Sequence, residues 1–424
     1  MNNKQKTEVL DMAAGNGLIN RRHMLSLGMT SFATVVASES LVAQSPSIPV
    51  WSKSPGPGAS EYGAPSRFTG DIKRLAYPAN PIAPGTGASR TPLHLLQGTI
   101  TPNSLHFERH HSGVPDIDPA EHRLIIHGMV RQPLVFSYED LLAYPQTSRT
   151  YFLECSGNSG ESTGANAGDR SAAALHGLVS CAQWTGVMLS TLLDEAGIAS
   201  GATWVAATGA DAASLGRSIP LNKALNDVFI ALYQNGEPIR PEQGYPMRMF
   251  VPGWEGNVSV KWLTQIKLTD GPTNFKDATS RYTELLADGK ALQFTFPMGV
   301  KSLITSPSGQ MSLQRQGLHE VTGLAWSGHG AIRRVEVSAD GGATWADAHL
   351  DENPTDLALV RFRIPWQWDG GPAVLQSRAT DTAGIVQPTR EAVLALYSPA
   401  NRYHFNGIQS WAVSTQGEVL NVYA

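Results

Sequence analysis

Residues 151–159 read Tyr-Phe-Leu-Glu-Cys-Ser-Gly-Asn-Ser, an apolar run that ends in a cysteine and a glycine-containing loop. The pattern predicts that Cys155 lies at the tip of a strand, where a soft sulfur ligand could meet a metal ion. The alternative is a buried structural thiol, because free cysteine also packs as a small apolar residue. The only other cysteine is Cys181, so no disulfide framework is indicated.

The composition is that of an ordinary globular protein. Of the 424 residues, 42% are hydrophobic and the formal net charge is -4, which indicates a sizeable core and no surface built for nucleic acid. No run of 18 apolar residues occurs, so no membrane span is predicted. The 41 glycines and 27 prolines favour loops and strands over a helical bundle.

Residues 1–43 have the layout of a twin-arginine export signal. Arg21 and Arg22 stand directly before a mildly apolar run, and small residues around Ala37 or Ala43 offer a cleavage site. We therefore expect a periplasmic protein that is exported in the folded state, after a cofactor has been inserted in the cytoplasm. The alternative is a chance arginine pair in a tail. Residues 44–100 are rich in Pro, Gly and Ser, which resist regular structure and predict an extended arm.

Two further regions differ in their hydrophobic pattern. Residues 101–298 mix short strands, such as 124–128, with short helices, of which one begins after a capping Ser137. Residues 299–424 carry strands of period two separated by turn signals, which predicts an immunoglobulin-like β-sandwich. The sandwich has no cysteine and no catalytic cluster, so we expect it to serve packing or dimerisation.

A histidine-rich segment could carry chemistry. It reads His106-Phe-Glu-Arg-His-His111. Three interpretations are open: a solvated loop, a zinc site, or an oxyanion cradle in which Arg109 presents a planar fork of donors.

A second segment, residues 244–262, places Arg248 before a glycine-bearing loop that leads to Lys261. Glycines let backbone N–H groups approach an anion, and the lysine adds a positive charge, although Walker spacing is absent. Tyr282 lies in a third, polar segment, where packing is the alternative role.

Together, and in this order, the segments HFERHH, FLECSGN, GRSIP, YPMRMFVPG with SVKWL, and RVEVSADGGATW resemble the sulfite oxidase family of molybdenum enzymes. The resemblance covers roughly residues 100–424. It implies an α+β protein, in which a mixed α/β molybdopterin-binding domain (101–298) precedes an immunoglobulin-like dimerisation domain (299–424). It also implies a molybdenum–molybdopterin cofactor, and no haem in this chain.

Residue by residue, the resemblance assigns Cys155 as the molybdenum ligand and Arg109 and Tyr282 as catalytic groups. The cofactor-binding positions that it implies are Phe107, Glu108, Arg109, His110, His111, Asp211, Gln243, Arg248, Ser259, Val260 and Lys261. Gln243 departs from the family, which has a histidine there; the amide keeps a donor and an acceptor but does not titrate.

Two further departures bear on the substrate. Family members that oxidise free sulfite carry one arginine after the cysteine motif, where this chain has Ser159 and Gly160, and another at the position of Asn406. Each missing charge-assisted contact removes about 1.5–3 kcal/mol of attraction for a small dianion. With the leader and the arm, this pattern is most similar to the SoxC-type branch, the molybdenum subunits of sulfane dehydrogenase. The resemblance therefore implies oxidation of sulfane sulfur on a carrier-protein cysteine during thiosulfate oxidation.

The chain has no C-x-x-C-H haem motif and no set of iron–sulfur cysteines, so its electrons must leave to an external acceptor. The resemblance implies a c-type cytochrome subunit, with a homodimer of this chain inside a heterotetramer. The alternatives are a periplasmic sulfite dehydrogenase that uses free sulfite and a non-catalytic scaffold relative.

Overall fold

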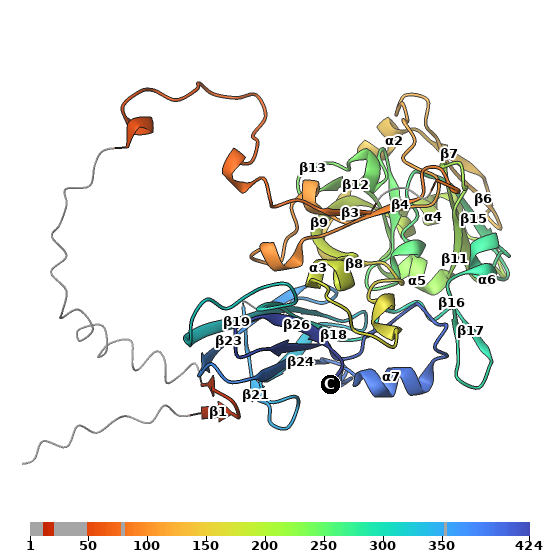
Figure 1. Cartoon of the computed structure of the whole chain (residues 1–424). Helices are drawn as coiled ribbons and strands as arrows, with labels where there is room; N and C mark the ends of the chain where they lie inside the picture. Colours follow the sequence, from red (N-terminus) through yellow and green to blue (C-terminus); the bar gives the residue numbers. More distant parts are fainter. Residues whose placement is uncertain (1–11, 21–48, 78–80, 352–353) are drawn as a thin grey trace, which may run out of the picture.

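The computed structural model describes residues 12–20, 49–77, 81–351 and 354–424. They form a mixed part and a β-sandwich, drawn above and below one another in Figure 1, which confirms the predicted α+β class with a terminal sandwich. Arg21, Arg22 and the expected cleavage region lie outside the described residues. Among the residues described, no helix has the length and apolar character needed to cross a membrane.

Two five-stranded sheets build the mixed part. Both have apolar faces, and β15 and β6 form a parallel pair, whereas the other pairs are antiparallel. The first sheet runs β11 (Gly216–Pro220), β10 (Trp204–Gly209), β15 (Leu263–Thr269), β6 (Leu124–Gly128) and β7 (Leu134–Phe136). The second runs β13 (Glu237–Pro238), β12 (Phe229–Gln234), β9 (Val179–Met188) and β8 (Gln146–Glu154), with β14 (Arg248–Phe250) also paired to β12.

The α-helices of the described residues are short, and three of them begin after a serine or threonine whose side chain caps the first turn. The predicted cap at Ser137 is confirmed: its hydroxyl accepts the Asp140 N–H (3.1 Å), and the Asp140 carboxylate accepts the Ser137 N–H (2.7 Å). The helices are α2 (Tyr138–Leu142), α3 (Ala172–His176), α4 (Leu189–Ala196), α5 (Leu221–Asn226), α6 (Lys276–Ser280) and α7 (Arg390–Leu396). A hairpin of β16 (Thr283–Leu285) and β17 (Ala291–Gln293) follows α6.

The sandwich buries tryptophans between two sheets. Its core also contains Phe152 and Cys181 from the mixed part, so the two parts share one continuous core. One sheet runs β1 (Met12–Ala14), β2 (Leu18–Ile19), β23 (Val360–Trp368), β19 (Gly317–Trp326) and β18 (Lys301–Ser306), with β22 (His349–Leu350) on β23. The other runs β21 (Ala346–Asp347), β20 (Ile332–Ser338), β24 (Ala373–Asp381), β25 (Ser410–Val413) and β26 (Val419–Val422).

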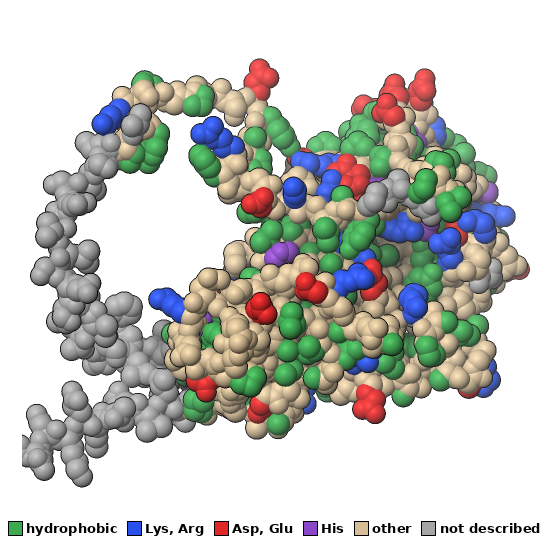
Figure 2. Space-filling view, in the orientation of Figure 1, with side chains coloured by type: hydrophobic (Ala, Val, Ile, Leu, Met, Phe, Trp, Pro, Cys, Tyr) green, Lys and Arg blue, Asp and Glu red, His purple; other side chains and the backbone are tan. Residues whose placement is uncertain are grey.

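The prediction that residues 44–100 avoid regular strand is wrong for their second half. There, β3 (Leu75–Tyr77) and β4 (Gly87–Arg90) form a three-stranded sheet with β5 (Glu108–His110). Because β5 supplies the hydrogen-bonding partner, pairing overrides the unfavourable local composition. Upstream, the arm stands away from the body in Figures 1 and 2, and Trp51 (81% exposed) and Phe68 (84%) are left uncovered.

Candidate active site

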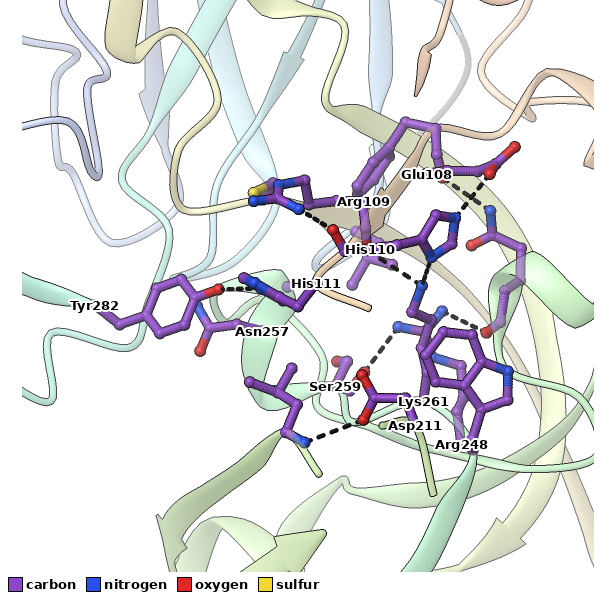
Figure 3. Close-up of a pocket in the computed structure, with 17 residues that line it drawn as sticks. Glu108, Arg109, His110, His111, Asp211, Arg248, Asn257, Ser259, Lys261 and Tyr282 are labelled. Carbon is purple, nitrogen blue, oxygen red and sulfur yellow. Dashed lines mark hydrogen bonds and ion pairs between the residues drawn. The ribbon is translucent and has the colours of Figure 1, made fainter. Parts of the chain in front are cut away.

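A cavity opens where β8, β5 and β14 converge, and Figure 3 draws its walls. The residues predicted from the sequence that line it are Phe107, Glu108, Arg109, His110, His111, Cys155, Asp211, Gln243, Arg248, Ser259, Lys261 and Tyr282. Val260 does not line it. Its side chain packs instead in the core of the mixed part.

Cys155 follows the last residue of β8 and lies in the cavity wall, half-buried. The turn after it is fixed by Asn158, whose amide donates to the Glu154 carboxylate (2.8 Å) and accepts the Leu178 N–H (3.0 Å). Gly256 closes on this turn, since a Cβ there would lie 2.9 Å from the Glu154 carbonyl oxygen. Burial raises the pKa of the Cys155 thiol, although the Gly157 backbone and the Arg109 charge favour the thiolate.

The middle of the histidine-rich segment forms β5 (Glu108–His110). Lys261 Nζ donates to His110 Nδ1 (2.8 Å), so His110 Nε2 carries the hydrogen that it donates to Glu108 (2.8 Å), as Figure 3 shows. His106 packs away from them, stacked on Phe107. The three histidines therefore have different partners, and within the described residues no group of three His, Cys, Asp or Glu side chains could hold a metal ion.

Arg248 and Lys261 bring positive charge to the cavity from below. Arg248 is 2% exposed and donates to the carbonyls of Gln243 (3.0 Å) and Ser259 (2.8 Å), while its Nε has no partner. Burial lowers the pKa of Arg248 to about 9, and burial with the Arg248 charge holds the pKa of Lys261 well below its usual range. Because these two positive charges are removed from water, an anionic ligand bound at this wall would stabilise them.

Two polar residues, Asp211 and Gln243, fix the loops around these cations. Asp211 accepts hydrogen bonds from the Ser112 hydroxyl (3.1 Å) and the Leu215 N–H (3.1 Å). The Gln243 amide donates to the Phe107 carbonyl (2.8 Å), so this uncharged side chain connects the residue just before β5 to the cavity wall.

Tyr282 and His111 form the opposite wall. The Tyr282 hydroxyl and His111 Nε2 are 2.8 Å apart. Burial lowers the pKa of His111 to about 4 and raises the pKa of Tyr282 far above its usual range. The tyrosine therefore stays protonated and the histidine uncharged at neutral pH. Tyr282 adopts a left-handed backbone (φ 49°) and stacks on the Arg217 guanidinium, 4.9 Å from the ring centre.

A buried ionic cluster that the sequence did not predict lies behind Tyr282. Glu255 accepts from Arg217 (2.7 Å) and from Asn257 (2.7 Å), and His404 Nε2 lies 3.4 Å from it. Burial lowers the pKa of His404, but the Glu255 and Glu284 carboxylates outweigh it, so the pKa is raised overall. Arg217 lies in the GRSIP motif and Glu255 in the segment 244–262, but neither motif indicates that the two side chains pair. The unpredicted residues of the cavity wall are Leu153, Leu215, Gly256, Asn257 and Trp262.

Ser159, Gly160 and Asn406, where the family resemblance predicted a loss of positive charge, add no cation to the cavity. A Cβ on Gly160 would lie 2.5 Å from the Arg402 carbonyl oxygen, so the backbone leaves no room for a side chain. Ser159 bonds His176 (2.6 Å) and Lys301 (2.5 Å), and Asn406 donates to the Val300 carbonyl (3.1 Å). None of the three lines the cavity.

Comparison with known proteins places this geometry in a family. Residues 111–276 match the model of an oxidoreductase molybdopterin binding domain, and residues 293–410 match that of a Mo-co oxidoreductase dimerisation domain. The crystal structure of the sulfane dehydrogenase SoxCD from Paracoccus pantotrophus is similar, with a TM-score of 0.86 and 42% identity, covering 91% of this chain and 99% of that one. This chain belongs to the sulfite oxidase family of molybdenum oxidoreductases.

Two curated relatives extend the comparison. Mouse mitochondrial sulfite oxidase is 31% identical over 299 residues, which is 66% of this chain and 54% of that protein. The NADH nitrate reductase of Ulva prolifera is 32% identical over 304 residues, 64% of this chain and 35% of that protein. The chain thus spans about a third to a half of the length of these relatives.

The family implies a molybdenum cofactor carried by a pterin, and the residues present fit such a group. The cavity offers a thiol at one wall and buried cations at another, where Arg248 Nε has no hydrogen-bond partner. A soft sulfur donor suits molybdenum, and buried cations suit a phosphate.

Proposed function

We propose that this protein is a molybdenum-dependent oxidoreductase that oxidises sulfane sulfur held on a cysteine of a carrier protein. It would act in the periplasm, after twin-arginine export, and pass electrons to a c-type cytochrome. The observation that carries the proposal is the placement of Cys155 in the wall of a cavity that Arg109, Arg248 and Lys261 also line. The likeness to a sulfane dehydrogenase over nearly the whole chain supports it.

Cys155 would hold the molybdenum, and Arg248, Lys261, Ser259 and Asp211 would hold the pterin and its phosphate. When bound, this cofactor supplies two-electron oxidation and oxygen transfer to sulfur. The buried thiol resists ionisation alone, so its thiolate needs a compensating cation, and Arg109 contributes to that compensation.

Arg109 and Tyr282 would act on the substrate. The Arg109 guanidinium lines the cavity and would orient the oxyanion that develops on sulfur. Tyr282 keeps its proton, because burial raises its pKa, and it can donate a hydrogen bond to an oxygen in the cavity. Its uncharged neighbour His111 holds the ring in place without adding charge.

The proposal of a carrier-bound substrate, rather than free sulfite, rests on the positive charge available in the cavity. Since Gly160 and Asn406 give the cavity no cation, a free dianion meets fewer positive groups than in sulfite-oxidising relatives. A sulfur attached to a carrier brings binding energy from protein–protein contacts instead. The exposed apolar side chains of the arm, such as Trp51, Phe68 and Ile82 (90% exposed), suit contact with the carrier or the cytochrome.

Steady-state reduction of cytochrome c by the purified, molybdenum-loaded protein tests the proposal. We expect kcat/KM for a persulfidated carrier to exceed that for free sulfite at least 100-fold. Equal or better turnover of sulfite would favour the sulfite dehydrogenase alternative. Protein purified from molybdenum-replete cells with no molybdenum bound would favour the scaffold alternative.

A further inference from the structure

The segment just ahead of the paired arginines forms a hairpin on the sandwich. β2 pairs antiparallel with β23 at Leu18 and Trp366, and β1 folds back on β2 (Figure 1). Leu18 is 0% and Ile19 1% exposed, and Leu18 belongs to the same hydrophobic core as Trp366. This short stretch of the expected leader is therefore part of the folded sandwich.

The turn of the hairpin makes directional contacts with both sheets. The Asn16 carbonyl accepts from the Trp366 indole (2.7 Å), and the Asn16 amide donates to the Ala339 carbonyl (2.8 Å). Ala339 follows β20, in the sheet opposite β23. The Gly15 N–H donates to the Thr344 hydroxyl (2.7 Å). Residues 16 and 339 are 323 positions apart, so this docking surface exists only once the sandwich has folded.

Gly17 makes the close approach possible. It has φ +94°, its carbonyl accepts the Gln367 N–H (2.8 Å), and a Cβ would lie 2.0 Å from the Gln367 carbonyl oxygen. Asn16 is also left-handed (φ 55°), as tight hairpin turns of Asn-Gly type require. No side chain larger than hydrogen fits at position 17 without moving the two strands apart.

We propose that residues 12–19 dock on the folded sandwich and withhold Arg21 and Arg22 from the export machinery until the hairpin is released. The inference rests on the proposed twin-arginine route. In the sequence, Arg21 and Arg22 follow the buried Ile19 by only two and three residues. An export receptor must surround the arginine pair and its flanking backbone. Its binding therefore competes with the contact between residues 12–19 and the sandwich.

Hydrogen exchange on the full, uncleaved chain tests the docking. We expect the amides of residues 12–19 to exchange at least 100-fold more slowly than in the free peptide, and the Gln367 amide to be protected with them. Gly17→Ala should remove most of this protection, whereas Met12→Ala, at a position 51% exposed, should keep it. Wild-type exchange as fast as in the free peptide would overturn the docking.

The rate of leader removal in cells tests the withholding. Gly17→Ala should be processed at least twofold faster than wild type, and Met12→Ala at the wild-type rate. Thr344→Val loosens the contact from the sandwich side without changing the leader, and it should shift the rate in the same direction as Gly17→Ala. Processing of Gly17→Ala and Thr344→Val at or below the wild-type rate would refute the withholding. If no variant loses its leader, the export route itself fails, while hydrogen exchange still decides the docking.

Discussion

Replacing Arg248 by Gln should separate cofactor retention from stability of the fold. Arg248 is almost fully buried, and burial lowers its pKa from 12.5 to about 9. At about 1.36 kcal/mol for each pH unit, keeping this charge inside costs the cofactor-free protein about 5 kcal/mol. Its two hydrogen bonds to the Gln243 and Ser259 carbonyls stabilise the folded state by only about 0.5–1.5 kcal/mol each, which is less than this cost.

The variant should therefore unfold no more easily than wild type when both lack cofactor. With cofactor, it loses a charge-assisted contact worth about 1.5–3 kcal/mol, which weakens retention roughly 10- to 150-fold. The assay is molybdenum content after gel filtration, beside urea unfolding of cofactor-free protein, with Arg149→Gln as an exposed control.

Two results would refute this reasoning. Wild-type molybdenum retention in Arg248→Gln would show that the guanidinium does not hold the cofactor. A cofactor-free variant that is less stable than wild type by several kcal/mol would show that Arg248 is structural.

Two further predictions concern single side chains. His106 is buried and its pKa is lowered to about 3, so the unfolded chain takes up the proton first and stability falls as pH drops below 6.5. Between pH 7.5 and 5, His106→Phe should lose about 2 kcal/mol less than wild type in urea unfolding, and equal losses would contradict this. Tyr282→Phe should lower kcat about 10- to 100-fold with molybdenum content unchanged, because one hydrogen-bond donor is removed; wild-type kcat would exclude a role for the hydroxyl.

Much of this fold could be predicted from the sequence because neighbouring residues determine where many helices and strands begin and end. The capping box at Ser137 and the strand that ends before Cys155 are set by neighbouring residues, and both are present. The sandwich strands that period-two patterns predicted are present, although burial alternates only in the second half of β23 and not along β20. β4 was missed because its stability comes from pairing with β5, not from its own composition.

The cavity itself could be predicted only through the order of motifs along the chain. Nothing near Tyr282 in the sequence shows that it faces His111, 171 positions away. The Glu255 cluster was missed for the same reason, since His404 comes from the other end of the chain. The hairpin at residues 12–19 was likewise hidden, because its partners lie in the sandwich.

X-ray absorption at the molybdenum edge addresses the metal ligand itself. In Cys155→Ser, the number of sulfur neighbours around the metal should fall by one relative to wild type, and turnover should be lost. Cys181→Ala, which removes the other thiol from the core, should leave both unchanged. An unaltered sulfur shell in Cys155→Ser would contradict the account.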